Sequence, residues 1–85
     1  MGENRAVSTA DPSRTLSVTA DIVASVLSIA VAPGEQVALG QTLLVLESMK
    51  MEIPITTTAA GTVVRLGVAV GDVVQEGDLL AEIAR

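Results

Sequence analysis

Short runs of aliphatic and β-branched residues, broken at intervals by Gly and Pro, make up the chain from Leu16 onward. No stretch shows a sustained helical period with capping residues, so the pattern predicts strands rather than helices. We expect strands at residues 16–20, 24–31, 42–48, 51–57, 62–69 and 79–83, with short additional strands around Val37 and Val74. Several short strands joined by Gly-containing turns are typical of a β-sandwich or a flattened β-barrel.

The first 15 residues differ in character from the rest. They are small and polar and show no hydrophobic period, so they have little apolar surface to bury. We therefore expect residues 1–15 to form a flexible tail and residues 16–85 to form one domain.

The chain also contains an internal repeat. When the sequence is shifted by 37 residues, segment 16–48 aligns with segment 53–85 without a gap, and eight positions are identical. The identical pairs are Thr19/Thr56, Val26/Val63, Val31/Val68, Ala32/Ala69, Gly34/Gly71, Val37/Val74, Gly40/Gly77 and Leu43/Leu80. Chance similarity between two Val- and Gly-rich segments would not readily reproduce two glycines at the same spacing. We interpret the repeat as a structural duplication, in which two copies pack face to face and each covers the apolar face of the other.

Composition restricts the possible functions. The chain is 49% hydrophobic but has no Phe, Tyr or Trp, so its core must be aliphatic. It has no His and no Cys, which removes the usual zinc and transition-metal ligands. Because His, Cys and Tyr are also common acid–base or nucleophilic groups, we expect no metal site, no catalytic residue and no enzyme activity of the chain by itself.

Charge and segment length exclude further classes. The net charge of −5, without basic clusters or aromatic stacking residues, argues against nucleic acid. The longest uncharged run, residues 22–34, has 13 residues and contains Pro33, so it is too short and too broken to span a membrane. A chain without cysteine is compatible with a reducing cytoplasm, where we expect the protein to be, as a monomer.

Lys50 is the single lysine of the chain and lies between Met49 and Met51. It falls between the two copies of the repeat, in a short connection between two predicted strands, so we expect it at the protruding tip of a tight hairpin. The tip contains no Gly, Asn, Asp or Pro, and turn propensity therefore does not explain its sequence. A functional constraint is the better explanation.

The segment "ESMKMEIPI", with the glycine-punctuated repeat on both sides, resembles the biotinyl/lipoyl carrier domain family, and within it the small single-domain biotin carrier (biotin/lipoyl attachment) proteins. The resemblance implies two four-stranded antiparallel sheets with quasi-twofold symmetry. It also implies that a biotin protein ligase attaches biotin to Lys50 through biotinyl-adenylate. The tethered biotin would then shuttle a carboxyl group between biotin carboxylase and carboxyltransferase subunits.

The residues around Lys50 allow more than one interpretation. We favour ligase recognition over core packing for Met49 and Met51, because methionine is common at adaptable interfaces. Glu47 and Glu52 could dock the ligase, form an ion pair with Lys50, or simply be solvated. Ser48 is a further candidate for ligase recognition. It also resembles the sequence context of lipoyl acceptors, which keeps lipoate as a minor alternative cofactor.

Two alternative functions therefore stay open, a lipoyl carrier and a biotinylated interaction or regulatory module that serves no carboxylase. The sequence departs from the family at residues 21–24, where many relatives have a Pro-rich turn that ends in Gly. The two copies of the repeat align without an extra loop, so the protruding "thumb" of some carrier subunits is absent.

Overall fold

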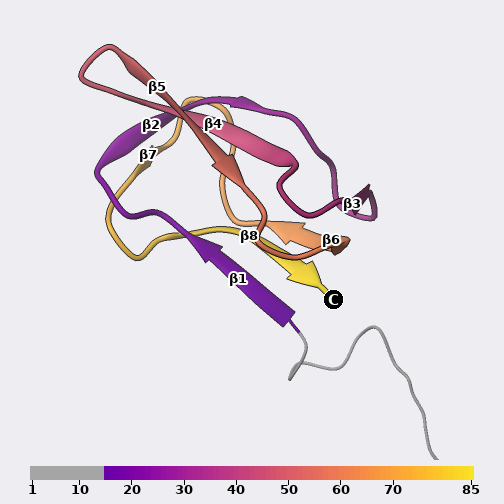
Figure 1. The fold of residues 1–85 in the computed structure, drawn as a ribbon. Coiled ribbons are helices and arrows are strands. Elements are labelled where there is room, and N and C mark those ends of the chain that lie inside the picture. The colour runs from indigo at the N-terminus through magenta and orange to yellow at the C-terminus, as the bar shows by residue number, and fades with distance from the viewer. Residues whose placement is uncertain (1–14) are drawn as a thin grey trace, which may run out of the picture.

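The computed structural model describes residues 15–85, which form eight strands and no helix. Figure 1 shows their arrangement along the chain. The strands are β1 (Thr15–Thr19), β2 (Ala24–Ile29), β3 (Gln36–Val37), β4 (Thr42–Ser48), β5 (Met51–Thr56), β6 (Gly61–Leu66), β7 (Val73–Val74) and β8 (Leu79–Ala84). Residues 1–14, where we expected a flexible tail, lie outside the described part of the chain.

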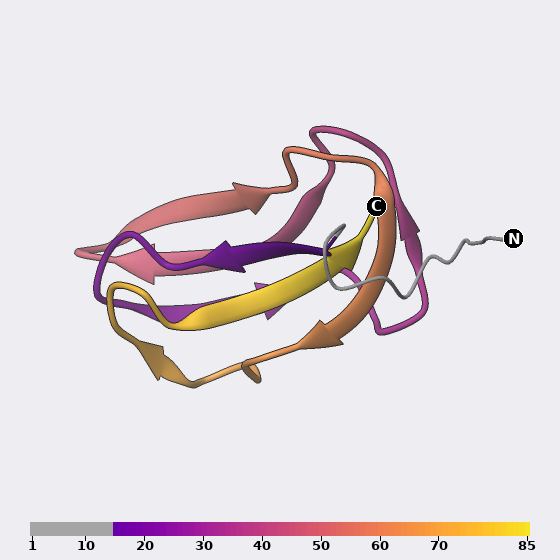
Figure 2. The same cartoon turned by 90° about the horizontal axis from the view of Figure 1, so that it is seen from below.

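The strands form two four-stranded antiparallel sheets, which confirms the predicted all-β sandwich or flattened barrel. The strand order is β1-β8-β6-β3 in one sheet and β5-β4-β2-β7 in the other. The hairpin of β4 and β5 reaches one end of the molecule, and the C-terminus lies at the other end (Figure 2). Within residues 15–85 there is no helix long and apolar enough to cross a membrane.

The internal repeat is present in the structure as a pseudo-twofold arrangement. A shift of 37 residues moves β2 onto β6, β3 onto β7, β1 onto β5 and β4 onto β8, and each strand moves into the other sheet. The order of the first sheet, read through this shift, becomes the order of the second. The duplication inferred from the sequence is therefore a duplication of strand position and pairing.

Backbone hydrogen bonds join each copy of the repeat to the other. Four glycines of the described chain have positive φ, which disfavours any residue with a Cβ: Gly34 (90°), Gly40 (83°), Gly71 (96°) and Gly77 (93°). The turn at Gly34 donates its N–H to the Val63 carbonyl at 2.7 Å, and the equivalent Gly71 donates to the Val26 carbonyl at 2.9 Å. Each turn needs a glycine for its positive φ and a strand of the other copy for its hydrogen bond. The repeated glycines therefore belong to turns that form only when the two copies are assembled.

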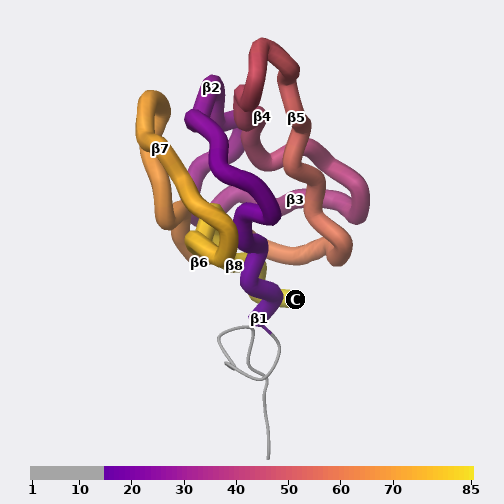
Figure 3. The backbone as a smooth tube through the Cα atoms, turned by 90° about the vertical axis from the view of Figure 1, so that its left-hand side faces the viewer, coloured from indigo at the N-terminus to yellow at the C-terminus, as the bar shows by residue number. Residues whose placement is uncertain are grey.

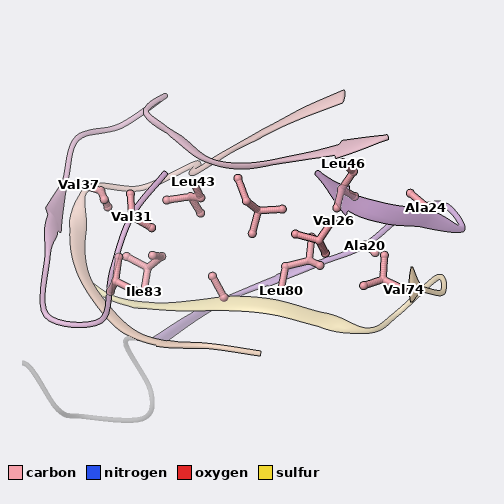
Figure 4. Packing of buried hydrophobic residues seen from close by; sticks show 13 residues of the cluster. Ala20, Ala24, Val26, Val31, Val37, Leu43, Leu46, Val74, Leu80 and Ile83 are labelled. Carbon is pink, nitrogen blue, oxygen red and sulfur yellow. The ribbon is translucent and has the colours of Figure 1, made fainter. Parts of the chain in front are cut away.

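The core between the sheets is aliphatic, as the composition predicted. Figure 4 shows its side chains pointing from both sheets into the space between them. The equivalent residues Leu43 and Leu80 are both completely buried. The buried cluster contains Ala20, Ala24, Val26, Val31, Val37, Leu43, Leu44, Leu46, Val63, Val74, Leu80, Ala81 and Ile83.

Strand ends are where the structure corrects the sequence prediction. Thr15, assigned to the tail, is the first residue of β1 and is paired with Ala84. The strands predicted at 24–31 and 62–69 end earlier, at Ile29 and Leu66. In both copies the pairing resumes after a register shift within the strand, and beyond Ile29 and Leu66 the chain leaves its sheet to reach the turn that bonds to the opposite sheet. Ala30 still donates its N–H to the Leu43 carbonyl, but Val31, although hydrophobic and buried, is not paired in the sheet.

We expect Leu43→Ala and Leu80→Ala to destabilise the protein by similar amounts, about 2–5 kcal/mol each, because both substitutions leave a cavity in the same shared core. Urea denaturation followed by circular dichroism measures both values. Leu39→Ala is the control, because Leu39 is 71% exposed and its loss should change the free energy of unfolding by about 0.5 kcal/mol or less. A small cost for one core leucine and a large cost for the other would contradict the equivalence of the two copies.

Candidate functional site

The hairpin between β4 and β5 is the candidate site. Ser48 is paired with Met51, so Met49 and Lys50 form a two-residue loop, as the sequence predicted. Seen from the tip end in Figure 3, this loop stands out beyond the neighbouring loops of the fold. The lysine therefore occupies the apex of a tight hairpin.

The backbone of this loop is strained. Met49 has φ 53° and Lys50 has φ 65°, and they are the non-glycine residues with positive φ in the part of the chain that the structure describes. Positive φ at both central residues is typical of a type I′ turn, for which Asn-Gly is the preferred sequence. A residue with a side chain costs about 1–2 kcal/mol in this region. Met-Lys is thus an unfavourable sequence for the tight turn that connects the two strands.

The Lys50 amine is available for chemistry. Lys50 is exposed, and within residues 15–85 no hydrogen bond or ion pair engages its side chain. The ion pair with Glu47 or Glu52 that the sequence left open is not formed. Because the amine has no hydrogen-bond or ion-pair partner, no contact has to break before its nitrogen can attack another group.

A second local cost lies at the base of the tip. Glu47 and Glu52 are both exposed and stand directly opposite each other across β4 and β5. Like charges in this position destabilise a strand pair. The tip therefore departs from local stability rules twice within six residues, which is the pattern expected where function constrains the sequence.

The two methionines do not fill the core. Met49 is 90% exposed and Met51 is 65% exposed, so the packing interpretation is wrong for both. Ser48, the last residue of β4 and the partner of Met51 across the hairpin, is half-buried. An exposed thioether side chain offers a flexible apolar contact to a partner, which is consistent with a recognition role.

The strands beneath the tip hold it rigidly. β4 is an inner strand and pairs with β2 on one side and with β5 on the other. Leu44 and Leu46 of β4 are completely buried, and Ile53 and Ile55 of β5 pack against the same core. The position of the lysine is thus fixed by the most deeply buried part of the sheet.

Ile22 and Val23 are residues beside the site that the sequence did not indicate. They lie in the turn before β2, and because Ser25 is paired with Glu47, this turn comes up beside the tip (Figure 2). Ile22 is 41% exposed and Val23 is 59% exposed, whereas the equivalent residues of the other copy are alanines. The departure from the family at residues 21–24 was the signal that could have found them.

No group of three or more His, Cys, Asp or Glu side chains in residues 15–85 is arranged to hold a metal ion. The described ion pair is on β6 and β8, where Arg65 Nε donates to Glu82 Oε1 at 2.8 Å. Arg65 is exposed and Glu82 is half-buried, so solvent weakens the contribution of the pair to stability. The tip is therefore the feature of the described chain with an accessible reactive group.

Comparison with known proteins gives a consistent result. A family model described as "Biotin-requiring enzyme" matches residues 15–83. The "Biotinylated protein TB7.3 homolog" of Mycobacterium leprae is 54% identical over 67 residues, which are 79% of this chain and 94% of the relative. The "Biotin-dependent acyl-coenzyme A carboxylase alpha3 subunit" of the same organism is 42% identical over 67 residues, which are 11% of its length.

A solved structure extends the comparison to three dimensions. A single-chain, multi-domain long-chain acyl-CoA carboxylase matches with a TM-score of 0.80 and 32% identity. The match covers 94% of this chain and 8% of the carboxylase. The chain is thus similar in sequence and fold to a small part of a much larger enzyme, and it matches nearly the full length of the small mycobacterial relative.

We expect Met49→Asn to raise the free energy of unfolding by about 0.5–1 kcal/mol, because asparagine tolerates positive φ and the exposed methionine loses no packing. A thermal melt should show this as an increase of a few degrees. Met51→Asn is the matched control, because Met51 lies in the strand without positive φ and should give no gain. Equal melting temperatures for the parent and Met49→Asn would contradict the strain.

Proposed function

The chain belongs to the family of biotin/lipoyl domains of biotin-requiring enzymes and is a biotin carrier, and we propose that Lys50 holds the biotin through an amide bond on its side-chain nitrogen. One observation carries the assignment of the site. The single lysine of the sequence stands at the apex of an exposed hairpin, without a partner among the described residues.

The residues of the tip fit the chemistry of attachment. An alkylammonium group must lose a proton before its nitrogen can attack an activated acyl carbon. The Nζ–C bond then forms as the bond between the acyl carbon and its leaving group breaks, and the product amide is neutral. A lysine at a hairpin apex can enter an enclosing active site, whereas a lysine on the face of a sheet would be obstructed by its neighbours. The tight turn of Met49 and Lys50 supports this proposal, because it leaves the Lys50 side chain exposed where the two strands meet.

Bound biotin would carry a carboxyl group between two active sites. The role of the chain is to present the cofactor on a rigid end, and tethering keeps it at an effective concentration in the millimolar range for a short link. The similarity to regions of two carboxylases supports an association with carboxylase components. Because this chain corresponds to a small part of those proteins, the partner would bind the substrate that is carboxylated and determine its identity.

The chain's own residues would take no catalytic role in this scheme. The absence of His, Cys and Tyr from the sequence supports a carrier without acid–base chemistry of its own. The absence of cysteine also supports a cytoplasmic location, where the partners of a carboxylase component are expected.

A biotin protein ligase would read the tip through the side chains next to Lys50. Met49 and Met51 offer apolar contacts, and Glu47 and Glu52 offer acceptors on the sides of the two strands. Charge on the strands and apolar contact at the apex together would distinguish this lysine from other exposed amines.

We expect Lys50→Arg to abolish biotin incorporation and to change the free energy of unfolding by about 0.5 kcal/mol or less, because the side chain is exposed. Co-expression with a biotin protein ligase, a streptavidin blot and a thermal melt test both parts. Adding Arg65→Lys to this variant is the control, because Arg65 is exposed but lies within a strand. Biotin on the double variant would mean that exposure alone, rather than the tip, determines the modified residue.

We expect Met49→Asp combined with Met51→Ala to reduce biotinylation by at least about tenfold, through lost apolar contacts and an added charge worth a few kcal/mol. The resulting tip has the sequence context of a lipoyl acceptor, so lipoylation should increase. Purified biotin and lipoate ligases, assayed separately on the two proteins, give the four rates. Leu39→Ala is the control and should leave biotinylation unchanged, because Leu39 is exposed but precedes β4 at the end away from the tip. Biotinylation of the double variant at the parent rate would show that the methionines are not recognition residues.

A further inference from the structure

The exposed edges of the two sheets are not equally protected against pairing with another chain. Among the described strands, β1, β3, β5 and β7 form the edges of the sheets. β3 and β7 have two residues each, which is too short to be an effective template. β5 contains Pro54 and Glu52, and both proline and charge are features that block edge-to-edge pairing.

β1 has neither feature, although it is the pseudo-twofold equivalent of β5. Its sequence is Thr-Leu-Ser-Val-Thr, with no charge and no proline. Ser17 occupies the position equivalent to Pro54, and Thr15 the position equivalent to Glu52. β1 and β5 occupy equivalent positions in the fold. The fold therefore does not require β1 to lack the proline and the charge that β5 has.

The outward groups of β1 can be assigned from its neighbour. Ala20, just beyond β1, donates its N–H to the Asp78 carbonyl at 2.9 Å and accepts from the Gly77 N–H at 2.8 Å, so its backbone faces β8. The register shift between Val18 and Thr19 places the extra residue, Leu80, on β8, so the alternation of backbone direction along β1 is kept. Ser17 and Thr19 therefore direct their N–H and C=O groups away from β8. The tolerance of proline at the equivalent Pro54 agrees with this, since proline has no N–H to give to a ladder.

The side chains of β1 make it complementary to itself. Read in either direction, the strand has Thr, an aliphatic residue, Ser, an aliphatic residue and Thr. In an antiparallel pair centred on Ser17, the half-buried Leu16 of one copy would lie beside Val18 of the other on the same face. Aliphatic pairs of this kind stabilise neighbouring strands, and no like charges meet.

We propose that β1 is a self-association edge, through which two copies of this chain pair antiparallel about a twofold axis at Ser17 and join two sheets into one. A strand of five residues buries much less area than a stable interface needs, so the association is weak and reversible. At low concentration the chain stays the monomer expected from its sequence.

The pairing leaves both candidate sites accessible. β1 runs toward the end of the molecule that bears the tip, because Thr19 is followed directly by the turn beside it (Figure 2). Antiparallel pairing therefore directs the two tips to opposite ends of the dimer. Self-association and modification of Lys50 are thus independent of each other, and the test does not depend on the proposed function.

Sedimentation equilibrium of the full 85-residue chain tests the edge. We expect a monomer mass at about 10 μM and a weight-average mass clearly above the monomer at about 1 mM. Ser17→Pro, which copies the equivalent residue of β5, should abolish the increase, whereas the control Ser17→Thr keeps the N–H and should retain it. Ser17→Arg provides a second disrupting variant, because two arginines would meet across the axis while each remains opposite Glu82 of its own sheet. Circular dichroism shows whether each variant is folded.

Two results would overturn the proposal. The first is a monomer mass at every concentration, which would mean that the edge is covered or ineffective in the full chain. The second is self-association that survives in folded Ser17→Pro or Ser17→Arg. Amide shifts that change with concentration around Ser17 and Thr19 are the expected NMR signature, and shifts confined to the exposed Leu39 or Val73 would place the interface elsewhere.

Discussion

The fold depends on hydrogen bonds that each copy of the repeat can make only with the other. Gly34 donates to Val63 and Gly71 donates to Val26, so a turn in one half is completed by a strand in the other. An aliphatic core without aromatic residues gives neither half enough apolar surface to fold alone. The duplicated sequence is therefore the means by which about 70 residues obtain one closed core from two incomplete sheets.

The same symmetry identifies the tip as a departure from the needs of folding. Under the shift of 37 residues, the pairing of Glu52 with Glu47 corresponds to the pairing of Thr15 with Ala84 at the other end of the molecule. At one end, the Met49–Lys50 turn connects β4 to β5. At the equivalent end, β1 begins and β8 ends. The rigid core supports strain and like-charge opposition at the tip, because both lie outside the contacts that join the two copies.

Most of the fold followed from the sequence because the controlling signals are local. The repeated glycines and the short aliphatic runs located every strand, including the two-residue β3 and β7. The ends of β2 and β6 did not follow, because Val31 and its equivalent keep a hydrophobic sequence while the chain crosses between sheets. The position of Lys50 in a tight hairpin was predicted from its place between the copies. The position of Ile22 and Val23 beside the tip depends on the register of β2 with β4, which composition does not encode.

The central claim is that Lys50 is the residue that carries biotin, and mass spectrometry of the unaltered protein purified from cells that supply a biotin protein ligase tests it most directly. We expect one added biotinyl group, located by fragment ions on Lys50 in a tryptic peptide of residues 15–65 that remains uncut at position 50. Trypsin does not cleave after an acylated lysine, so the missed cleavage is an independent sign of the same bond. An unmodified mass, a lipoyl group, or biotin at the N-terminal amine with cleavage after Lys50 would contradict the assignment of biotin to Lys50.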